Sequence, residues 1–273
     1  MAKPILKWAG GKKQLLEEIK KRLPENFNNY FELFIGGGAL AFDLMHKDTI
    51  INDINTELIN FYDCLKKDYK KVLGFLDFFI KEYNKNPRVF YYILRDEYET
   101  MSESKSKYFK AARTLLINKT CFNGLYRVNS KNNFNVPWNQ KAEIINLFDL
   151  DNLKSVVNFL KTVKIFNKSF DNFRDDIKKG DFVYLDPPYD KLNKTTFNSY
   201  NPSEFTREDQ KKLRDFCDYI NNVGAYFLVS NHSTEFILDI YKNYNIIFVD
   251  ARRMINSNKN GRGFIKEVLI SNF

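Results

Sequence analysis

The stretch of sequence that decides the fold class is YFELFIGGGALAFDLMHKDTIIND, residues 30–53. Residues 30–35 form a short aromatic and aliphatic run that ends at three glycines, which predicts a strand followed by a tight turn. Residues 39–45 favour a helix, and residues 49–51 predict a second strand that ends just before Asp53. A strand, a turn, a helix and a second strand in this order form the building block of a parallel sheet.

The same alternation returns in the second half of the chain, after a segment of different character. Further strands are expected at residues 163–167, 181–185, 225–230 and 268–271, and further helices at residues 12–23 and 207–220. The intervening segment has helical periodicity at residues 58–65, 72–83, 89–98 and 108–118. It ends in a hairpin pattern, residues 126–128 and 134–136 around a turn-rich stretch. We therefore expect an α/β domain with a mostly parallel sheet, formed by residues 1–57 and 148–273, and a mainly helical insertion, residues 58–147, that carries a β-hairpin.

Composition limits the class of protein. Hydrophobic residues make up 44% of the chain and charged residues 28%, as in soluble globular proteins, and no apolar run approaches a membrane span. The first residues are too short and polar a stretch for a secretory signal. The three cysteines are far apart and the two histidines lack neighbouring ligands, so we expect no disulfide framework, no metal and a reduced, cytoplasmic compartment.

Positive charge is concentrated in two stretches. The net charge of +9 suggests an acidic partner, although A/T-biased coding alone can produce it. Residues 105–141 contain eight Lys and Arg side chains and no Asp or Glu, and residues 251–266 contain five and none. Such acid-free stretches favour contacts to the phosphates of a nucleic acid.

The tetrapeptide Asp186-Pro187-Pro188-Tyr189 directly follows an expected strand, and ligands of open parallel sheets bind at the carboxyl ends of strands. The Asp186 carboxylate and the Pro187 carbonyl can accept both N–H bonds of a nucleobase amine, which localises its lone pair. The two prolines stiffen this backbone, and Tyr189 offers a face on which a base can stack. The alternative is a simple turn after a strand.

The glycines at residues 36–38 form a turn that a ligand can approach closely, and Asp53 suits the ribose hydroxyls of an adenosine-containing ligand. Alone, this pattern also fits a structural turn or a nicotinamide cofactor; together with Asp186 it favours S-adenosylmethionine. The Gly-Gly-Lys that ends at Lys12 is not a phosphate loop, because another lysine follows it and no strand precedes it. Trp8 and Lys12 can instead stack on a ligand base and pair with a carboxylate.

Taken in order, the motifs of this chain resemble those of the Dam-type DNA adenine-N6 methyltransferases of the D12 class, over essentially the whole chain. They are Lys-Trp-Ala-Gly-Gly-Lys (7–12), Phe-Ile-Gly-Gly-Gly-Ala (34–39), Ile-Asn-Asp-Ile-Asn (51–55), Phe-Asn-Gly-Leu-Tyr-Arg-Val-Asn (122–129), Phe-Asn-Val-Pro (134–137), Asp-Pro-Pro-Tyr (186–189) and Ser-Asn-His (230–232). The resemblance implies the S-adenosylmethionine-dependent methyltransferase fold, a mostly parallel doubly wound sheet, with residues 58–147 as the DNA-recognition domain.

The resemblance also implies roles for individual residues. Those implied to bind S-adenosylmethionine are Trp8, Lys12, Phe34, Gly36, Gly38, Asp53, Ile54 and Asp186. Those implied in catalysis are Asp186, Pro187, Pro188 and Tyr189, and those implied to contact DNA are Lys7, Phe122, Asn123, Arg127, Asn135 and Pro137. Arg127 matches an arginine that reads a guanine and Phe122 an aromatic that wedges into the base stack; a phosphate contact and core packing are the respective alternatives.

The implied activity is methyl transfer to a flipped adenine in double-stranded DNA, with GATC as the favoured site, as in restriction–modification systems with a cognate endonuclease. In one departure, Trp138-Asn139-Gln140 stands where the family commonly has aromatic-Gly-Arg, so a basic contact is missing. The alternatives are an RNA or protein-glutamine N-methyltransferase, a cytosine-N4 methyltransferase, which usually carries Ser in place of Asp186, and a DNA-binding module without activity.

Overall fold

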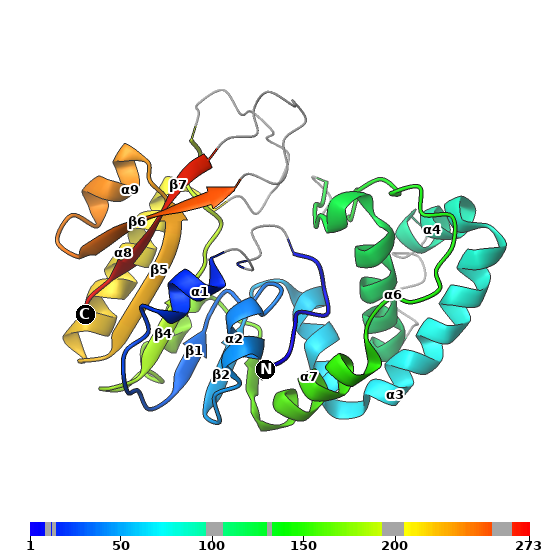
Figure 1. Cartoon of the computed structure of the whole chain (residues 1–273), viewed down its shortest axis with the longest axis horizontal. Coiled ribbons are helices and arrows are strands. Elements are labelled where there is room, and N and C mark those ends of the chain that lie inside the picture. The colour runs from blue at the N-terminus through cyan, green and yellow to red at the C-terminus, as the bar shows by residue number, and fades with distance from the viewer. Residues whose placement is uncertain (9–11, 13–14, 97–105, 130–132, 193–204, 253–263) are drawn as a thin grey trace.

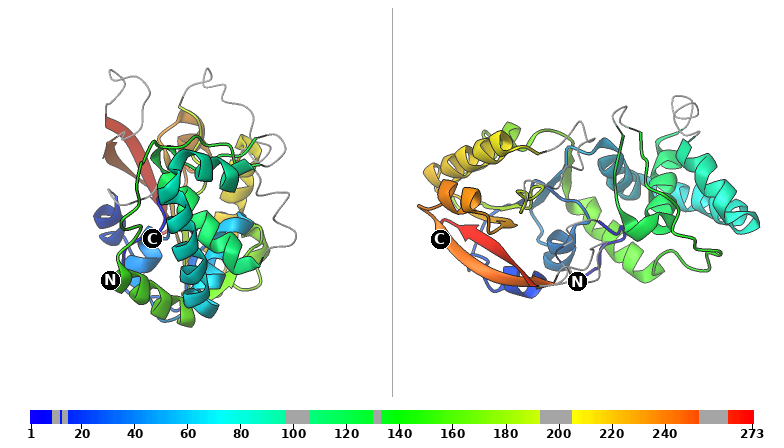
Figure 2. Two further views of the ribbon diagram at one scale, coloured as in Figure 1. Left: turned by 90° about the vertical axis from the view of Figure 1, so that its right-hand side faces the viewer. Right: turned by 90° about the horizontal axis from the view of Figure 1, so that it is seen from above.

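The computed structural model describes residues 1–8, 12, 15–96, 106–129, 133–192, 205–252 and 264–273 (Figure 1). These residues form a sheet covered by helices, beside which a second group of helices lies (Figures 1 and 2). In the part of the chain so described, no helix is both long enough and apolar enough to cross a membrane.

The sheet has seven strands in the order β3-β2-β1-β4-β5-β7-β6. They are β1 (Tyr30–Glu32), β2 (Thr49–Asn52), β3 (Lys164–Phe166), β4 (Phe182–Leu185), β5 (Tyr226–His232), β6 (Asn245–Arg252) and β7 (Phe264–Ser271). The first five are parallel to one another, and β7 runs antiparallel between β5 and β6. The expected mostly parallel sheet is therefore confirmed.

Helices cover both faces of the sheet, as a doubly wound fold requires. They are α1 (Leu16–Lys20), α2 (Ala39–Leu44), α7 (Leu150–Thr162), α8 (Arg207–Asn222) and α9 (Glu235–Ile240). One hydrophobic core joins α1, α2 and α7 to one face of β1, and a second core joins α8 and α9 to the other face. Because both faces of β1 and β4 are buried, these strands consist of consecutive buried residues rather than alternating ones.

The second group of helices consists of α3 (Thr56–Lys85), α4 (Pro87–Asp96) and α6 (Lys107–Thr120), followed by the 3-10 turn Phe122–Gly124. Helix α6 packs along α3. The two helices expected at 58–65 and 72–83 are one helix with a kink at Asp68, whose φ is −161°. The core on the α2 face continues without a break into these helices, and the expected division at residues 58 and 147 stays a prediction.

The expected hairpin is present as a short antiparallel pairing. Val128 and Phe134 form an isolated bridge, and the Asn135 N–H donates to the Arg127 carbonyl at 3.0 Å. The Asn129 N–H donates to the Asn133 carbonyl at 2.9 Å, which closes the base of the turn. The hairpin thus presents Arg127 and Asn135 side by side.

Candidate active site

Three strand ends meet at one edge of the sheet. Strands β2, β1 and β4 are neighbours, and in the register Glu32 of β1 lies between Ile51 and Tyr184. The glycine turn that follows β1, Asp53 after β2 and Asp186 after β4 therefore leave the sheet together. This is the edge at which open parallel sheets bind ligands.

Trp8 packs against the glycine turn. Gly36 and Gly38 have φ of +47° and +72°, in the left-handed region that favours glycine. A Cβ on Gly36 would lie 2.8 Å from Cδ1 of Trp8, and a Cβ on Gly38 would collide with the ring of Phe42. The turn can therefore carry no side chain at Gly36 or Gly38, and its backbone remains within reach of a ligand.

Asp53 is tied to the same turn. Its carboxylate accepts hydrogen bonds from the N–H groups of Gly36 at 3.1 Å and Asn55 at 2.9 Å. Burial raises the pKa of Asp53, and these N–H groups oppose the rise. Ile54 is 69% exposed, whereas Phe34 packs against Phe170 on the other face of the sheet. Of the residues implied in cofactor binding, Trp8 and Asp53 thus each contact Gly36, whereas the Phe34 side chain packs on the other face of the sheet.

Lys12 and Asp186 form an ion pair at the end of β4. Lys12 Nζ lies 2.8 Å from Asp186 Oδ1, and only 7% and 20% of the two side chains are exposed. Lys12 Nζ also lies 4.6 Å from the centroid of the Tyr189 ring. Burial raises the pKa of Asp186 to about 6, and Lys12 limits the rise. The cation keeps a poorly hydrated carboxylate ionised near neutral pH.

Tyr189 is held by Glu267, which sequence reasoning did not identify, and by His232 of the Ser-Asn-His motif. Its hydroxyl donates to Glu267 Oε2 at 2.8 Å, and the ring makes an edge contact with His232 at 4.8 Å between centroids. Glu267 of β7 lies opposite His232 of β5 in the register. Only the sheet pairing brings Glu267 here, because 78 residues separate it from Tyr189 in the sequence.

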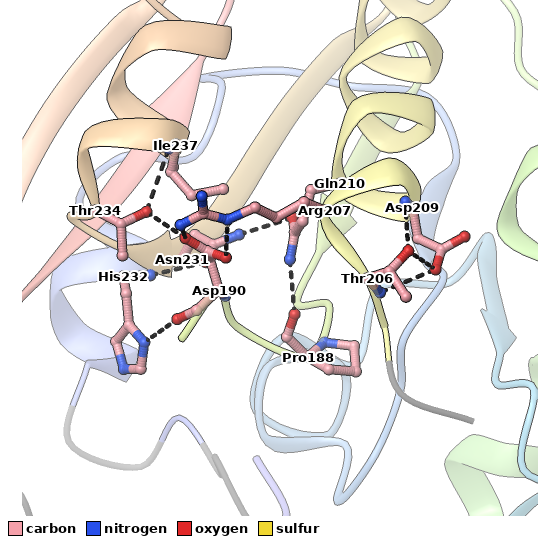
Figure 3. Close-up of polar contacts among 10 residues, drawn as sticks. All are labelled: Pro188, Asp190, Thr206, Arg207, Asp209, Gln210, Asn231, His232, Thr234 and Ile237. Atoms are coloured by element: carbon pink, nitrogen blue, oxygen red, sulfur yellow. Dashed lines mark hydrogen bonds and ion pairs between the residues drawn. The ribbon is translucent and has the colours of Figure 1, made fainter. Parts of the chain in front are cut away.

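A buried amide network holds the second proline (Figure 3). Gln210 of α8 donates from Nε2 to the Pro188 carbonyl at 2.9 Å, and Asn231 donates from Nδ2 to Gln210 Oε1 at 3.1 Å. Both amide side chains are almost fully buried. Among the described residues no hydrogen bond reaches the Pro187 carbonyl. The loop is therefore held at Pro188, and within the described part of the chain the Pro187 carbonyl keeps its capacity to accept a hydrogen bond.

Asp190, the residue after the motif, anchors the loop from behind (Figure 3). Arg207 donates to its two carboxylate oxygens at 3.1 Å each, and the Thr234 hydroxyl donates to Oδ2 at 2.6 Å. Burial pushes the pKa of Asp190 upward, but the bonds from Arg207 and Thr234 outweigh it, so the pKa is lowered. His232 Nδ1 lies 2.7 Å from the Asp190 carbonyl, to which it donates. Asp190 is thus an anchor that is ionised at neutral pH.

A second buried carboxyl lies beneath Asp186. Glu32 is 3% exposed and accepts a hydrogen bond from the Tyr30 hydroxyl at 2.5 Å. Burial raises the pKa of Glu32 to about 8; the Tyr30 bond opposes this, and the negative charge of Asp186 adds to it. Glu32 is therefore neutral at pH 7, so it adds no second negative charge directly beside Asp186.

The residues implied in DNA contact lie together on the helical side of the molecule. Phe122 is 50% exposed, which contradicts the core-packing alternative, and its N–H donates to the Pro137 carbonyl at 2.8 Å. Asn123 is exposed and has a left-handed φ of +55°. Arg127 is exposed, and it donates from Nε to Asn135 Oδ1 at 2.7 Å and from Nη2 to the Asn135 carbonyl at 3.2 Å. Those bonds fix the direction of the guanidinium.

The basic stretch 105–141 is less uniform in space than in sequence. Arg113 is buried and donates to Glu57, and Lys107 Nζ lies 3.7 Å from Asp63 Oδ2, so acids of α3 neutralise both. Lys119 differs: burial lowers its pKa to about 8, and the positive charges of Lys7 and Lys141 lower it further. The excess charge therefore gathers around Lys119. Lys105 and Lys131, and the side chains of the second basic stretch, lie outside the described residues.

Comparisons with known proteins agree on one family. A family model described as D12 class N6 adenine-specific DNA methyltransferase matches residues 8–255. The chain is 37% identical to Type II methyltransferase M1.LlaDCHI of Lactococcus lactis subsp. cremoris, over 99% of this chain and 95% of the relative. It is 38% identical to Type II methyltransferase M.MjaIII of Methanocaldococcus jannaschii, over 99% of each chain. It is 33% identical to a DNA adenine methylase of Serratia marcescens, over 97% and 96%.

Replacing Glu32 by Gln should change how the stability of the protein depends on pH. The folded-state pKa of Glu32 is raised from 4.5 to about 8, so the stability contributed by the neutral carboxyl is present below pH 4.5 and lost as pH rises through 8. Glu32→Gln stays neutral and keeps an acceptor for Tyr30. The free energy of unfolding of Glu32→Gln, measured by thermal unfolding, should therefore increasingly exceed that of the wild type between pH 5 and pH 9. The difference should reach on the order of a few kcal/mol. A difference that does not vary with pH would contradict this assignment.

Proposed function

This chain belongs to the D12 class of N6 adenine-specific DNA methyltransferases, and from that premise we propose that it methylates an adenine flipped out of duplex DNA, within GATC. The observation that carries the catalytic assignment is the Lys12–Asp186 ion pair beside the Pro187 carbonyl, at the end of a central parallel strand. Membership in a DNA methyltransferase family gives no support to an RNA or protein-glutamine substrate.

S-adenosylmethionine is the methyl donor that the family implies, and we assign it to the glycine turn, Trp8 and Asp53. The fit rests on three features: a turn without room for a side chain at Gly36 or Gly38, an aromatic ring packed on it, and a half-buried carboxylate at the next strand end. Asp53 suits the ribose hydroxyls, and Trp8 suits the adenine ring. The bound donor would supply an activated methyl group on its sulfonium.

The target amine is assigned to Asp186 and Pro187. The exocyclic nitrogen of adenine is a weak nucleophile because its lone pair is delocalised into the ring. A carboxylate and a carbonyl that accept its two N–H bonds localise the pair and orient it. Asp186 is ionised at neutral pH and can take up the proton that the nitrogen sheds. Gln210 and Asp190 keep the loop rigid, so this geometry exists before substrate binds.

DNA reading is assigned to the helical part, residues 58–147, and chemistry to residues 1–57 and 148–273. The Arg127 guanidinium is held by Asn135 across the hairpin, which suits a contact to the O6 and N7 atoms of a guanine. The half-exposed Phe122 ring suits insertion beside the extruded base. GATC is proposed from the resemblance at residues 122–137. Two relatives named Type II methyltransferases support a role in protecting DNA from a cognate endonuclease. In this proposal the protein acts in the cytoplasm, where it would encounter both the endonuclease and the DNA.

Methyl transfer should require the Asp186 carboxylate. Purified protein with labelled S-adenosylmethionine should label a GATC duplex, and Asp186→Ala should lose this activity while binding the duplex with little change. Because the pKa of Asp186 is raised to about 6, kcat/KM of the wild type should rise as pH increases through that value. Label on RNA or polypeptide but on no duplex DNA would refute the function itself.

Arg127 should discriminate one base pair of the recognition site. Arg127→Ala removes a paired donor set, so the preference for guanine at one position should fall by about 1–3 kcal/mol. Expression in a host without adenine methylation, followed by mapping of modified bases across its genome, measures this preference at every position. Asn135→Ala should weaken the same preference by a smaller factor, because it only frees the guanidinium to move. An unchanged site in both variants would identify Arg127 as a phosphate contact.

Lys119 and Lys141 should bind DNA phosphates. The double variant Lys119→Gln with Lys141→Gln should weaken binding to every sequence and lower the salt dependence of log K by about 2, close to one unit per lost phosphate contact. Lys107→Gln is the matched control, because Asp63 already lies beside that charge. Equal slopes in the double variant and the wild type would mean that DNA lies elsewhere.

A further inference from the structure

The dipeptide Lys7–Trp8 contacts both parts of the molecule, and we propose that it couples cofactor binding to DNA binding, with Tyr126 and Asn118 as the residues that position it. The inference rests on the proposed function, in which Trp8 belongs to the cofactor site and the hairpin that carries Arg127 reads DNA. Figure 1 shows the N-terminal segment (dark blue) running between the sheet and the helical part.

The first contact is with the glycine turn. The Trp8 ring lies so close to this turn that a Cβ on Gly36 would be 2.8 Å from Cδ1 of Trp8, and a Cβ on Gly37 would be 3.2 Å from its Cβ. The turn is itself fixed, because Tyr62 of α3 donates its hydroxyl to the Gly36 carbonyl at 2.8 Å and Asp53 accepts the Gly36 N–H. A ligand that binds against this fixed turn therefore also meets the Trp8 ring and restricts the position of that ring.

The second contact is with the hairpin. The rings of Trp8 and Tyr126 are stacked, with centroids 5.4 Å apart and planes 24° apart. Tyr126 directly precedes Arg127, and its ring also packs on Phe134, at 5.7 Å, across the hairpin pairing. The Trp8 ring thus packs on the glycine turn and, through its stack with Tyr126, on the hairpin strand that carries Arg127.

The third contact fixes the main chain. Asn118 of α6 accepts the Lys7 N–H at 2.8 Å and donates to the Lys7 carbonyl at 2.6 Å, and its side chain is buried. The Lys7 side chain also fills the space beside Gly124, where a Cβ would lie 2.5 Å from Cβ of Lys7. Asn118 thus holds the main chain of the dipeptide on α6. A ligand that restricts the Trp8 ring therefore also restricts the Tyr126 ring stacked on it, and the backbone does not absorb the effect.

Coupling of this kind is reciprocal. If cofactor binding orders Trp8 and thereby the hairpin, DNA binding must tighten cofactor binding by the same factor. A stacked aromatic pair contributes enough to change an equilibrium roughly two- to tenfold. That factor is the expected size of the effect.

The experiment measures the dissociation constant of S-adenosylhomocysteine, the demethylated product, by calorimetry with and without a saturating GATC duplex. Wild type should bind it roughly two- to tenfold more tightly in the presence of the duplex. Tyr126→Phe, the matched control, keeps the ring and should keep the ratio. Tyr126→Ala removes the ring and should bring the ratio close to one. Tyr126→Leu fills the space without an aromatic face and should give the same ratio as Tyr126→Ala. It replaces the alanine variant in the experiment if Tyr126→Ala unfolds at too low a temperature.

Two results would overturn the coupling: a wild-type ratio of one, or a ratio in Tyr126→Ala and Tyr126→Leu equal to that of the wild type. The second result would show that the two sites communicate by another route. A wild-type protein that binds neither the duplex nor S-adenosylhomocysteine would instead contradict the proposed function, and that result is visible before any variant is made.

Discussion

The active site depends on one buried cation next to one buried carboxylate. Asp186 lies near the buried carboxyl of Glu32, and burial alone would favour the neutral form of both Asp186 and Glu32. Lys12 supplies the nearby positive charge, and it stabilises the ionised form of Asp186 while Glu32 stays protonated. Asp186 and Glu32 therefore differ in protonation state because the Lys12 ammonium pairs with Asp186 and not with Glu32. Removal of Lys12 would leave an uncompensated charge, which is far more costly than the pair itself is stabilising.

Most of the fold was predictable because its signals are local. The run of residues 30–53 contains a strand, a glycine turn, a helix and a strand, and the structure follows it closely. Helix α7 was also within reach, since Leu153, Val156, Val157 and Leu160 recur at helical spacing, but it was not identified. Strand β6 could not be predicted from the sequence, because it is an edge strand with exposed apolar side chains and lacks the buried pattern of β1. Only its pairing with β7 defines it. The kink of α3 at Asp68 falls in the gap between the two helices expected at 58–65 and 72–83, and the Asp68 side chain accepts the Lys71 N–H there.

The residues of the candidate site also divide into those that the sequence predicts and those that only the tertiary structure reveals. Asp53 and Asp186 were predictable because consecutive chain segments place them at the carboxyl ends of parallel strands. Gln210 and Glu267 were not, because α8 and β7 bring them to the loop from remote parts of the sequence. The basic stretch misled for the converse reason: it contains no acids of its own, but α3 supplies them to Arg113 and Lys107 in space. Local sequence thus identifies the groups that react, and tertiary packing adds the groups that hold them.

The bond between Arg127 and Asn135 also constrains how this scaffold can diversify. An unsupported arginine on an exposed hairpin samples many rotamers and loses that freedom on binding, whereas here a neighbour across the pairing has already limited it. A different side chain at position 127 would lie beside Asn135, whose two oxygens are placed to accept hydrogen bonds from a guanidinium. New target sites should therefore arise in this lineage through linked pairs of substitutions on the two strands, so that the hairpin, rather than the single residue, is the unit of evolutionary change.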